Sequence, residues 1–191
     1  MKKNDIEINE LLKDMFNVMA IAQTSCFEWE IDCKLDTIGR RIKRFIEDAI
    51  GDEVDTISDK TKKIYEKLRE ESRAGKNPDT EYRRLIESSP ELNKLKKQEQ
   101  ELFKKKIDFE FQPVLITTTQ RKEAYNNIPD DKKQTVEWKG SSIDLINLHS
   151  RFRALVADRW IVIEGTEEAK DVERSAAVVE DKTPRATRNR G

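Results

Sequence analysis

The chain has 191 residues, of which 39% are charged and only 36% hydrophobic, against roughly 25% and 45–50% in an average soluble domain. This length suits one domain with at most an appendage, and no apolar run approaches the roughly 20 residues that cross a bilayer. The 37 basic and 38 acidic residues nearly cancel, so the overall charge does not indicate binding to nucleic acid or to an anionic membrane.

The first predicted element is an amphipathic helix over residues 5–23, which Asp5 can cap. Its apolar residues recur at the i, i+3, i+4 spacing of one helical face; they are Ile8, Leu11, Leu12, Met15, Val18, Met19 and Ala22. Residues 24–32 then alternate apolar residues with acids, which is typical of a short strand. That run is too short to decide against a helix.

A long helix is predicted from Cys33 to about Ser72, because apolar residues follow a heptad-like spacing. The first stripe consists of Leu35, Ile38, Ile42, Phe45 and Ala49. The second consists of Ile46, Ile50, Val54, Ile57, Thr61, Ile64 and Leu68. The second stripe is displaced near Gly51, so either the stripe shifts around the helix or the helix bends, and a kink near Gly51 is expected.

Residues 74–80 are rich in helix-breaking residues and predict a turn. A short helix carrying Tyr82, Leu85 and Ile86 follows, and Ser89 and Pro90 have the form of a helix start. This further helix is predicted to run to about Lys106. It should lie antiparallel to the long helix, and the two together should form a helical hairpin.

Short strands dominate the next part of the prediction. Residues 107–111 and 114–119 read as strand with a break at Pro113, and residues 135–139 repeat the alternating pattern. Residues 142–160 show the spacing of an amphipathic helix. A last apolar run, Trp160–Gly165, is expected to close a small mixed sheet.

The expected fold is therefore mainly α with a small α+β C-terminal part: a long antiparallel helical hairpin, a short mixed sheet and one amphipathic helix. Residues 1–106 form the helical region, residues 107–165 the α+β region, and residues 166–191 a flexible tail whose end is basic.

Enzyme chemistry finds little support in the residue types. His149 is the single histidine, the two cysteines Cys26 and Cys33 lack metal-ligand spacing, and the glycines are scattered. We therefore expect no cofactor, no metal and no catalytic activity. The two cysteines are too few for the disulfide framework of a small secreted domain, and no apolar signal segment follows Met1. A cytoplasmic location, with a virus particle as the alternative, fits best.

One enzymatic alternative remains open. The acids Glu7 and Glu10 are spaced to share a helix face, as are Asp52 and Asp55. Four such carboxylates would suit a Mg²⁺-dependent nucleotide hydrolase of the all-α type. The second pair departs from the Glu-x-x-Asp form of those enzymes, so this is the least favoured function.

Nucleic-acid binding is a stronger alternative. A basic cluster lies near the start of the long helix and a second lies in the tail; the candidate contacts are Arg40, Arg41, Lys43, Arg44, Arg185, Arg188 and Arg190. The lysines and arginines further along the helix alternate with acids, as on a solvated face. Trp29, Trp138 and Trp160 each occupy an apolar position in a pattern and are expected in the core.

The favoured function is a non-enzymatic structural or assembly protein. A heptad stripe with few apolar residues buries little surface by itself, so self-association or docking onto other proteins should complete it. The expected partners are other proteins of a larger assembly, with a homo-oligomer expected. The expected interface residues are Leu35, Ile38, Ile42, Phe45, Ile57, Ile64 and Leu68.

The layout of residues 35–118, a helical hairpin followed by the segment IDFEFQPVLI, resembles small accessory proteins from the structural modules of tailed bacteriophages. The likeness is one of architecture. It implies a role in a phage particle or its assembly, and it transfers no functional residue.

Overall fold

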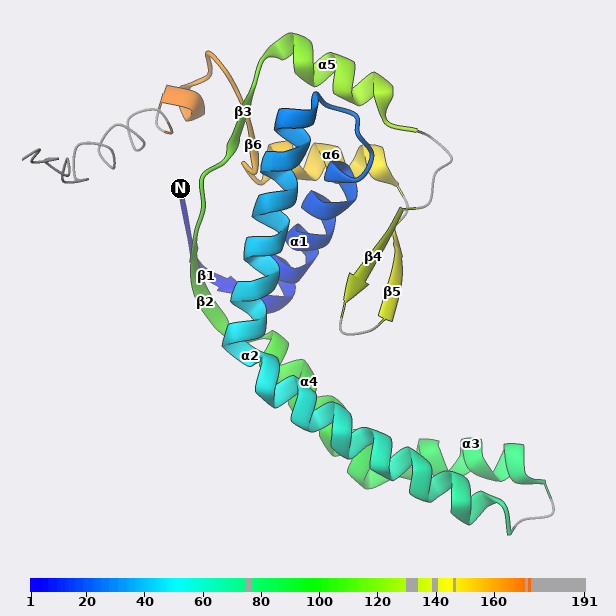
Figure 1. Cartoon of the computed structure of the whole chain (residues 1–191). Helices are drawn as coiled ribbons and strands as arrows, with labels where there is room; N and C mark the ends of the chain where they lie inside the picture. The colour runs from blue at the N-terminus through cyan, green and yellow to red at the C-terminus, as the bar shows by residue number, and fades with distance from the viewer. Residues whose placement is uncertain (75–76, 130–133, 139–140, 146, 171, 173–191) are drawn as a thin grey trace, which may run out of the picture. The chain divides into compact units, whose positions relative to one another are not determined.

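The computed structural model of the protein describes residues 1–74, 77–129, 134–138, 141–145, 147–170 and 172, and for residues 134–138 and 141–145 it describes the backbone alone. The fold is mainly α with small two-stranded sheets, as the sequence predicts (Figure 1). The chain divides into two compact units. The first comprises residues 1–4, 13–41 and those from Asp108 onward, and the second comprises residues 5–12 and 42–107. The expected helical region 1–106 thus contributes to both units.

The elements follow one another along the chain as Figure 1 labels them. The helices are α1 (Ile8–Ala22), α2 (Trp29–Ser72), α3 (Pro78–Ser88), α4 (Pro90–Phe103), α5 (Thr118–Asn127) and α6 (Leu148–Ala157). The strands are β1 (Lys2–Glu7), β2 (Lys106–Glu110), β3 (Val114–Ile116), β4 (Gln134–Trp138), β5 (Ser141–Leu145) and β6 (Ile161–Ile163).

The strands of the described residues pair in three separate two-stranded sheets, β1 with β2, β3 with β6, and β4 with β5. β3 and β6 are parallel, with Val114 opposite Ile161. β4 and β5 are antiparallel, with Val136 opposite Ile143. The last apolar run therefore pairs with one of the predicted strands, as expected, but the pairs do not join into a single mixed sheet.

The beginning of the chain differs from the prediction. Helix α1 starts at Ile8, where the expected helix starts at residue 5, and the preceding residues form β1. Asp5 lies within that strand at φ +56° rather than capping the helix. The Ile8 N–H donates instead to the Lys105 carbonyl, 3.0 Å away. A strand partner distant in sequence thus overrides the local helical pattern.

The strand considered for residues 24–32 does not form. The Ile31 and Asp32 N–H groups both donate to the Glu28 carbonyl, at 2.9 and 3.2 Å, and α2 begins at Trp29. The helical alternative is therefore the correct one. α2 continues without interruption through Gly51 to Ser72, so the break in apolar spacing there does not end the helix.

Two corrections concern the C-terminal part. Thr117–Thr119, expected as strand, instead begin α5, because the Thr117 hydroxyl accepts from the Gln120 N–H at 3.1 Å and the Gln120 amide oxygen accepts from the Thr117 N–H at 2.9 Å. This reciprocal pair is a capping box. Ser141–Leu145, expected to start a helix, pair with β4 as β5. α6 is consequently shorter than the predicted helix over residues 142–160.

α6 ends in a turn that directs Trp160 into the core. Arg159 adopts the left-handed conformation at φ +62°, the Arg159 N–H donates to the Val156 carbonyl at 3.2 Å, and the Trp160 N–H donates to the Leu155 carbonyl at 2.9 Å. This is the Schellman arrangement of a helix C-terminus. Trp160 is fully buried as a result, which confirms its expected place.

Around Trp160 the first unit has an aromatic core with one buried ion pair. The Phe109 and Phe111 rings lie 6.1 and 4.0 Å from the Trp160 ring. The Lys3 ammonium lies 4.6 Å from the same ring and 2.7 Å from the Asp14 carboxylate. Desolvation raises the pKa of Asp14, and its hydrogen bond with Lys3 opposes that rise. The pattern of α1 marks position 14 as polar, yet Asp14 is buried.

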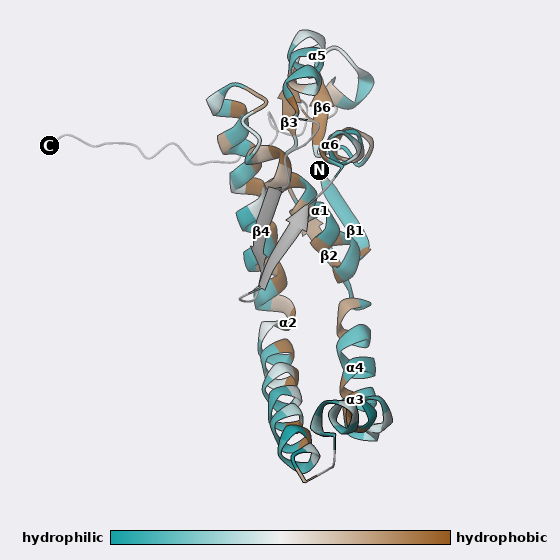
Figure 2. Ribbon diagram, turned by 90° about the vertical axis from the view of Figure 1, so that its right-hand side faces the viewer, coloured by the Kyte–Doolittle hydropathy of each residue, from teal (hydrophilic) through white to brown (hydrophobic). Residues whose placement is uncertain are grey.

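The second unit contains the helical hairpin. α4 runs antiparallel to α2, since Glu53 forms an ion pair of 3.2 Å with Lys105 while Ile57 shares a hollow with Gln98 and Leu102. Figure 2 shows hydrophilic colours over most of α3 and α4. The buried apolar residues of these helices and of this part of α2 are few: Ile42, Ile46, Ile50, Leu68, Leu92 and Leu95.

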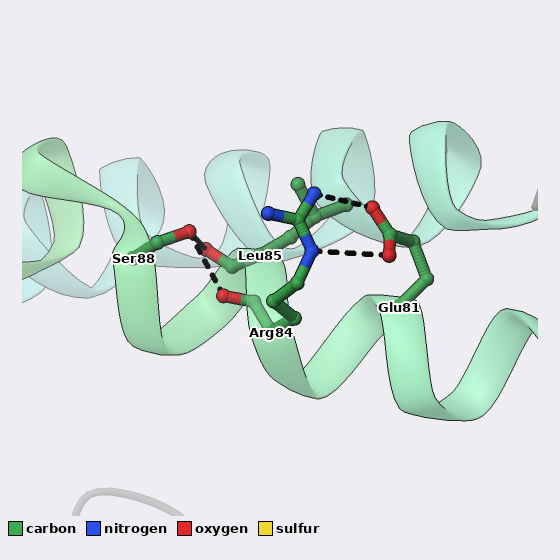
Figure 3. A network of polar contacts seen from close by, with 4 residues as sticks. All are labelled: Glu81, Arg84, Leu85 and Ser88. Atoms are coloured by element: carbon green, nitrogen blue, oxygen red, sulfur yellow. Dashed lines mark hydrogen bonds and ion pairs between the residues drawn. The ribbon is translucent and has the colours of Figure 1, made fainter.

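Local hydrogen bonds define the short helix α3 and its junction with α4. The Arg84 guanidinium donates twice to the Glu81 carboxylate, at 2.6 and 3.1 Å, and the Ser88 hydroxyl donates to the Arg84 carbonyl at 2.8 Å (Figure 3). Ser89 then caps α4 by accepting from the Leu92 N–H at 3.3 Å. The predicted helix start at Ser89 and Pro90 is confirmed.

The segment expected as a tail begins with regular structure. The Thr166 hydroxyl accepts from the Ala169 N–H at 3.3 Å and starts a helical turn over residues 167–170, in which Ala169 is buried. Residues 166–170 therefore belong to the folded part of the chain. Residue 171 and residues 173–191 lie outside the described residues.

Candidate functional site

A groove of about 740 Å³ runs within the first unit between α2 and the segment that leads from β2 into β3. We call it the α2–β3 groove. α2 contributes Trp29, Glu30, Cys33, Lys34, Thr37, Ile38 and Arg41. The opposite side consists of Phe109, Phe111, Gln112, Pro113, Val114 and Leu115, together with Glu164 after β6.

The sequence explains how the two sides of the groove arise. The α2 residues recur at intervals of three or four, so they share one face of the helix. From Trp29 to Arg41 this face is about 18 Å long, at 1.5 Å per helical residue. The facing segment runs from β2, which ends at Glu110, to β3, which begins at Val114, and Pro113 between them has no N–H to donate. This segment and the helix face together line the α2–β3 groove.

Trp29 is the prominent apolar residue of this groove. Its side chain is 81% exposed, and no other large hydrophobic residue among those described is classed as exposed. Its expected place in the core is wrong, because α2 begins at Trp29 and its first turn orients the indole outward. The side chain of Trp138 lies outside what the structure describes. Tryptophan is usually well buried, so its exposure beside a groove is a feature of binding surfaces.

The charged groups of the groove fall into paired and unpaired sets. Lys34 forms an ion pair with Glu30 at 2.8 Å, and that hydrogen bond lowers the pKa of Glu30. Arg41 lies 5.8 Å from the Phe109 ring centre, and no described carboxylate comes within ion-pair distance of it. Glu164 likewise has no cationic partner among the described residues. Arg41 and Glu164 are therefore available for groups of opposite charge.

The two cysteines differ in environment, and one of them lies in the groove. Cys33 is exposed, whereas Cys26 is buried and desolvation raises the pKa of its thiol. Asp32, next to Cys33, has one carboxylate oxygen that is buried without a partner among the described residues. Desolvation raises the pKa of Asp32 to about 6, and a hydrogen bond from the Phe27 N–H opposes the rise.

The expected interface residues are dispersed rather than gathered. Leu35 and Ile42 are buried inside the chain, as is Leu68. Ile38 is half-buried and lines the α2–β3 groove. Phe45, Ile57 and Ile64 are half-buried, and Ile57 lines a separate hollow of about 590 Å³ between α2 and α4 within the second unit. The heptad pattern thus indicates residues that pack mainly inside the chain, and it does not include Trp29.

Only some of the residues expected to contact nucleic acid lie in the part of the chain that the structure describes. Arg40 is engaged in an ion pair of 2.8 Å with Asp36, and Arg41 packs against Phe109. Arg44 is exposed and Lys43 is half-buried. Arg185, Arg188 and Arg190 lie outside the described residues. Nucleic-acid binding stays a prediction.

The carboxylate and histidine candidates take separate places. Glu7 belongs to β1 and Glu10 to α1, so they do not share a helix face as expected, while Asp52 and Asp55 are exposed on α2. Within the described residues, no three His, Cys, Asp or Glu side chains are grouped as a metal site would require. One ring nitrogen of His149 lies 3.1 Å from the Tyr125 carbonyl oxygen.

Comparison with protein-family models, with curated proteins and with solved structures finds no match for this chain. In the part of the chain that the structure describes, no helix combines the length and apolar character needed to span a membrane.

Proposed function

We propose that this protein is a non-enzymatic structural or assembly protein that binds a partner protein in the α2–β3 groove. The observation that carries the proposal is the exposure of Trp29, 81%, at one edge of this groove. Most of the Trp29 side chain is in contact with water. Its burial against a partner would contribute about 2 kcal/mol or more to the free energy of binding. A component of a phage particle is one setting in which such a protein would act.

The shape and composition of the groove support a protein partner. Apolar walls from Ile38, Phe111 and Leu115 are combined with the charges of Arg41 and Glu164. Interfaces between proteins combine an apolar centre with a polar rim in this way. A second copy of the chain is one such partner, and it would give the homo-oligomer that the sequence predicts.

Cys33 offers a direct test, because its exposed thiol lies inside the groove while Cys26 is buried. A photo-activatable crosslinker is attached to Cys33, and the labelled protein is illuminated in an extract of its native host. The control carries the same label at Asp59→Cys in a Cys33→Ser background, since Asp59 is exposed on α2 outside the groove.

We expect a defined adduct from Cys33 that the label at position 59 does not give. Trp29→Ala should reduce the yield about tenfold or more, in line with the loss of an interface tryptophan. An adduct at twice the mass of the chain would identify the partner as a second copy. Equal adducts from both labels, or a yield unchanged by Trp29→Ala, would contradict the proposal.

A further inference from the structure

The α2–β3 groove is lined by β3, a strand with one edge unpaired among the described residues, as well as by the exposed tryptophan. β3 pairs with β6 on one side, and no described strand pairs with its other side. The Val114 N–H donates to the Trp160 carbonyl at 2.9 Å, and the Ile116 carbonyl accepts from the Glu164 N–H at 2.8 Å. Both residues therefore direct their peptide groups towards β6.

Peptide groups alternate in direction along a strand, so the N–H and C=O of Leu115 point away from β6. Leu115 is also one of the residues that line the groove. An unpaired strand edge is a ready template for another strand. Here the edge carries one backbone donor and one backbone acceptor, at a residue that lines the same groove as α2.

We infer that the partner enters the α2–β3 groove as an extended segment of five or six residues and pairs with β3 at Leu115. This inference rests on the proposed function and specifies the chemical form of the partner. The length follows from the 18 Å face of α2, since an extended chain advances about 3.3 Å per residue. One of its apolar side chains packs against Trp29.

The charges of the groove specify the order of residues in that segment. Arg41 lies against Phe109, at the start of the extended wall of the groove, and the Glu164 N–H donates to the Ile116 carbonyl just past its other end. The two charges therefore lie at opposite ends of that wall. Antiparallel strand pairs outnumber parallel ones, so the inferred segment runs antiparallel to β3, from the Glu164 end to the Arg41 end. It therefore carries a basic residue near its start, β-branched residues in the middle, and an acidic residue near its end.

A displayed library of random ten-residue peptides is the probe. Peptides are selected on the whole protein and counter-selected on Trp29→Ala. Affinities of the selected peptides are then measured for two variants of the strand edge, Leu115→Pro and Leu115→Ala. Both shorten the side chain, but only proline removes the N–H donor. Val114 is already extended and the Leu115 N–H does not serve the β3–β6 pair, so proline is compatible with this edge position.

We expect Leu115→Pro to bind the selected peptides about tenfold more weakly than Leu115→Ala does. The thermal unfolding curves of these two variants should coincide. Selected peptides should follow the order basic, β-branched, acidic, and the reversed sequences should bind more weakly. Arg41→Glu should weaken binding, and replacing the acidic residue of the peptide by lysine should restore it.

The outcomes separate the two claims. Peptides that depend on Trp29 but bind Leu115→Pro as well as Leu115→Ala would overturn strand pairing and leave the groove as the docking site. Failure to recover any Trp29-dependent peptide would overturn both. Should Leu115→Pro bind more weakly than Leu115→Ala and also unfold at a lower temperature, nuclear magnetic resonance of the unmodified protein decides whether the peptide pairs with β3. The Leu115 amide signal of the unmodified protein must then shift on peptide binding, and an unshifted signal overturns strand pairing.

Discussion

Replacing Asp32 by asparagine should stabilise the protein near neutral pH and have little effect in acid. Asp32 lies in the first turn of α2, and one of its carboxylate oxygens is buried without a partner among the described residues. Desolvation raises the pKa of this carboxyl group from 3.8 to about 6. The folded protein therefore binds the Asp32 proton more tightly than the unfolded chain does.

The magnitude follows from the shift in pKa. About two units at 1.36 kcal/mol each give about 3 kcal/mol for a fully shielded group. Only part of the Asp32 side chain is buried, so solvent screening reduces this to about 1–2 kcal/mol. Because the pKa of Asp32 is raised in the folded state, it is the protonated carboxyl group that stabilises the fold. This contribution to the free energy of unfolding is complete below about pH 4, is lost as the pH rises through 6, and stays lost above that.

Urea unfolding followed by circular dichroism, at a series of pH values from about 4 to 7.5, measures the effect. The free energy of unfolding of Asp32→Asn should exceed that of the unmodified protein by about 1–2 kcal/mol at the upper end and converge with it at the lower end. Glu30→Gln is the matched control in the same helical turn. Lys34 lowers the pKa of Glu30, so its small contribution disappears as the pH falls. A constant difference between Asp32→Asn and the unmodified protein across this range would refute the reasoning.

Four further substitutions test the packing, the backbone conformation and the helix capping of the fold by urea unfolding. Gly39→Ala should lower the free energy of unfolding by about 1 kcal/mol, because the new methyl group would lie 2.5 Å from Cγ of Met19 and the crowding exceeds the gain in helix propensity; shortening Met19 to alanine should reverse the sign. Arg159 and Gly165 both have positive φ, a conformation that glycine adopts without strain. Arg159→Gly should therefore raise the free energy of unfolding by up to about 1 kcal/mol, and Gly165→Ala should lower it by about 1 kcal/mol. Equal effects of the two substitutions would contradict this reasoning. Ser89→Ala should cost about 1 kcal/mol through loss of the α4 cap, and an unchanged midpoint would show that the cap is not stabilising.

Helical periodicity predicted the largest elements correctly. The long helix, the breaker-rich turn and the start of α4 at Ser89 and Pro90 follow from patterns that repeat over many residues, so single exceptions do not obscure them. The strands at residues 106–110 and 114–116, separated at Pro113, were also predictable, because proline cannot donate to a strand pair.

Pairing between distant segments explains most of the errors. The predicted helix starts at residue 5, but residues 2–7 form β1 because β2, far along the chain, supplies a partner strand. Ser141–Leu145 look like a helix start and instead pair with β4. The threonines at 117–119 have high strand propensity, yet the Gln120 side chain completes a capping box and makes them the start of α5. The pattern Thr-x-x-Gln was the available signal for that helix.

The candidate site was largely hidden from sequence reasoning. Trp29 alternates with other apolar residues as a core residue would, and its exposure depends on where α2 begins. The other wall of the groove comes from residues 109–115, which are about 80 positions away in the chain. Nothing in the local pattern brings these segments together. Only the three-dimensional arrangement shows that Ile38 and Arg41 face Leu115 and Phe109 across one groove.

The most direct test of the proposed docking site is to measure how readily Trp29 is oxidised by hydroxyl radicals, first in the purified protein and then in the complex isolated from its native host. Trp160 is the internal control, since it is fully buried in the folded chain and should stay unreactive in both samples. We expect Trp29, 81% exposed by itself, to oxidise readily in the purified protein and about tenfold more slowly in the complex. Equal oxidation of Trp29 in the two samples would show that no partner covers the groove and would contradict the proposed function.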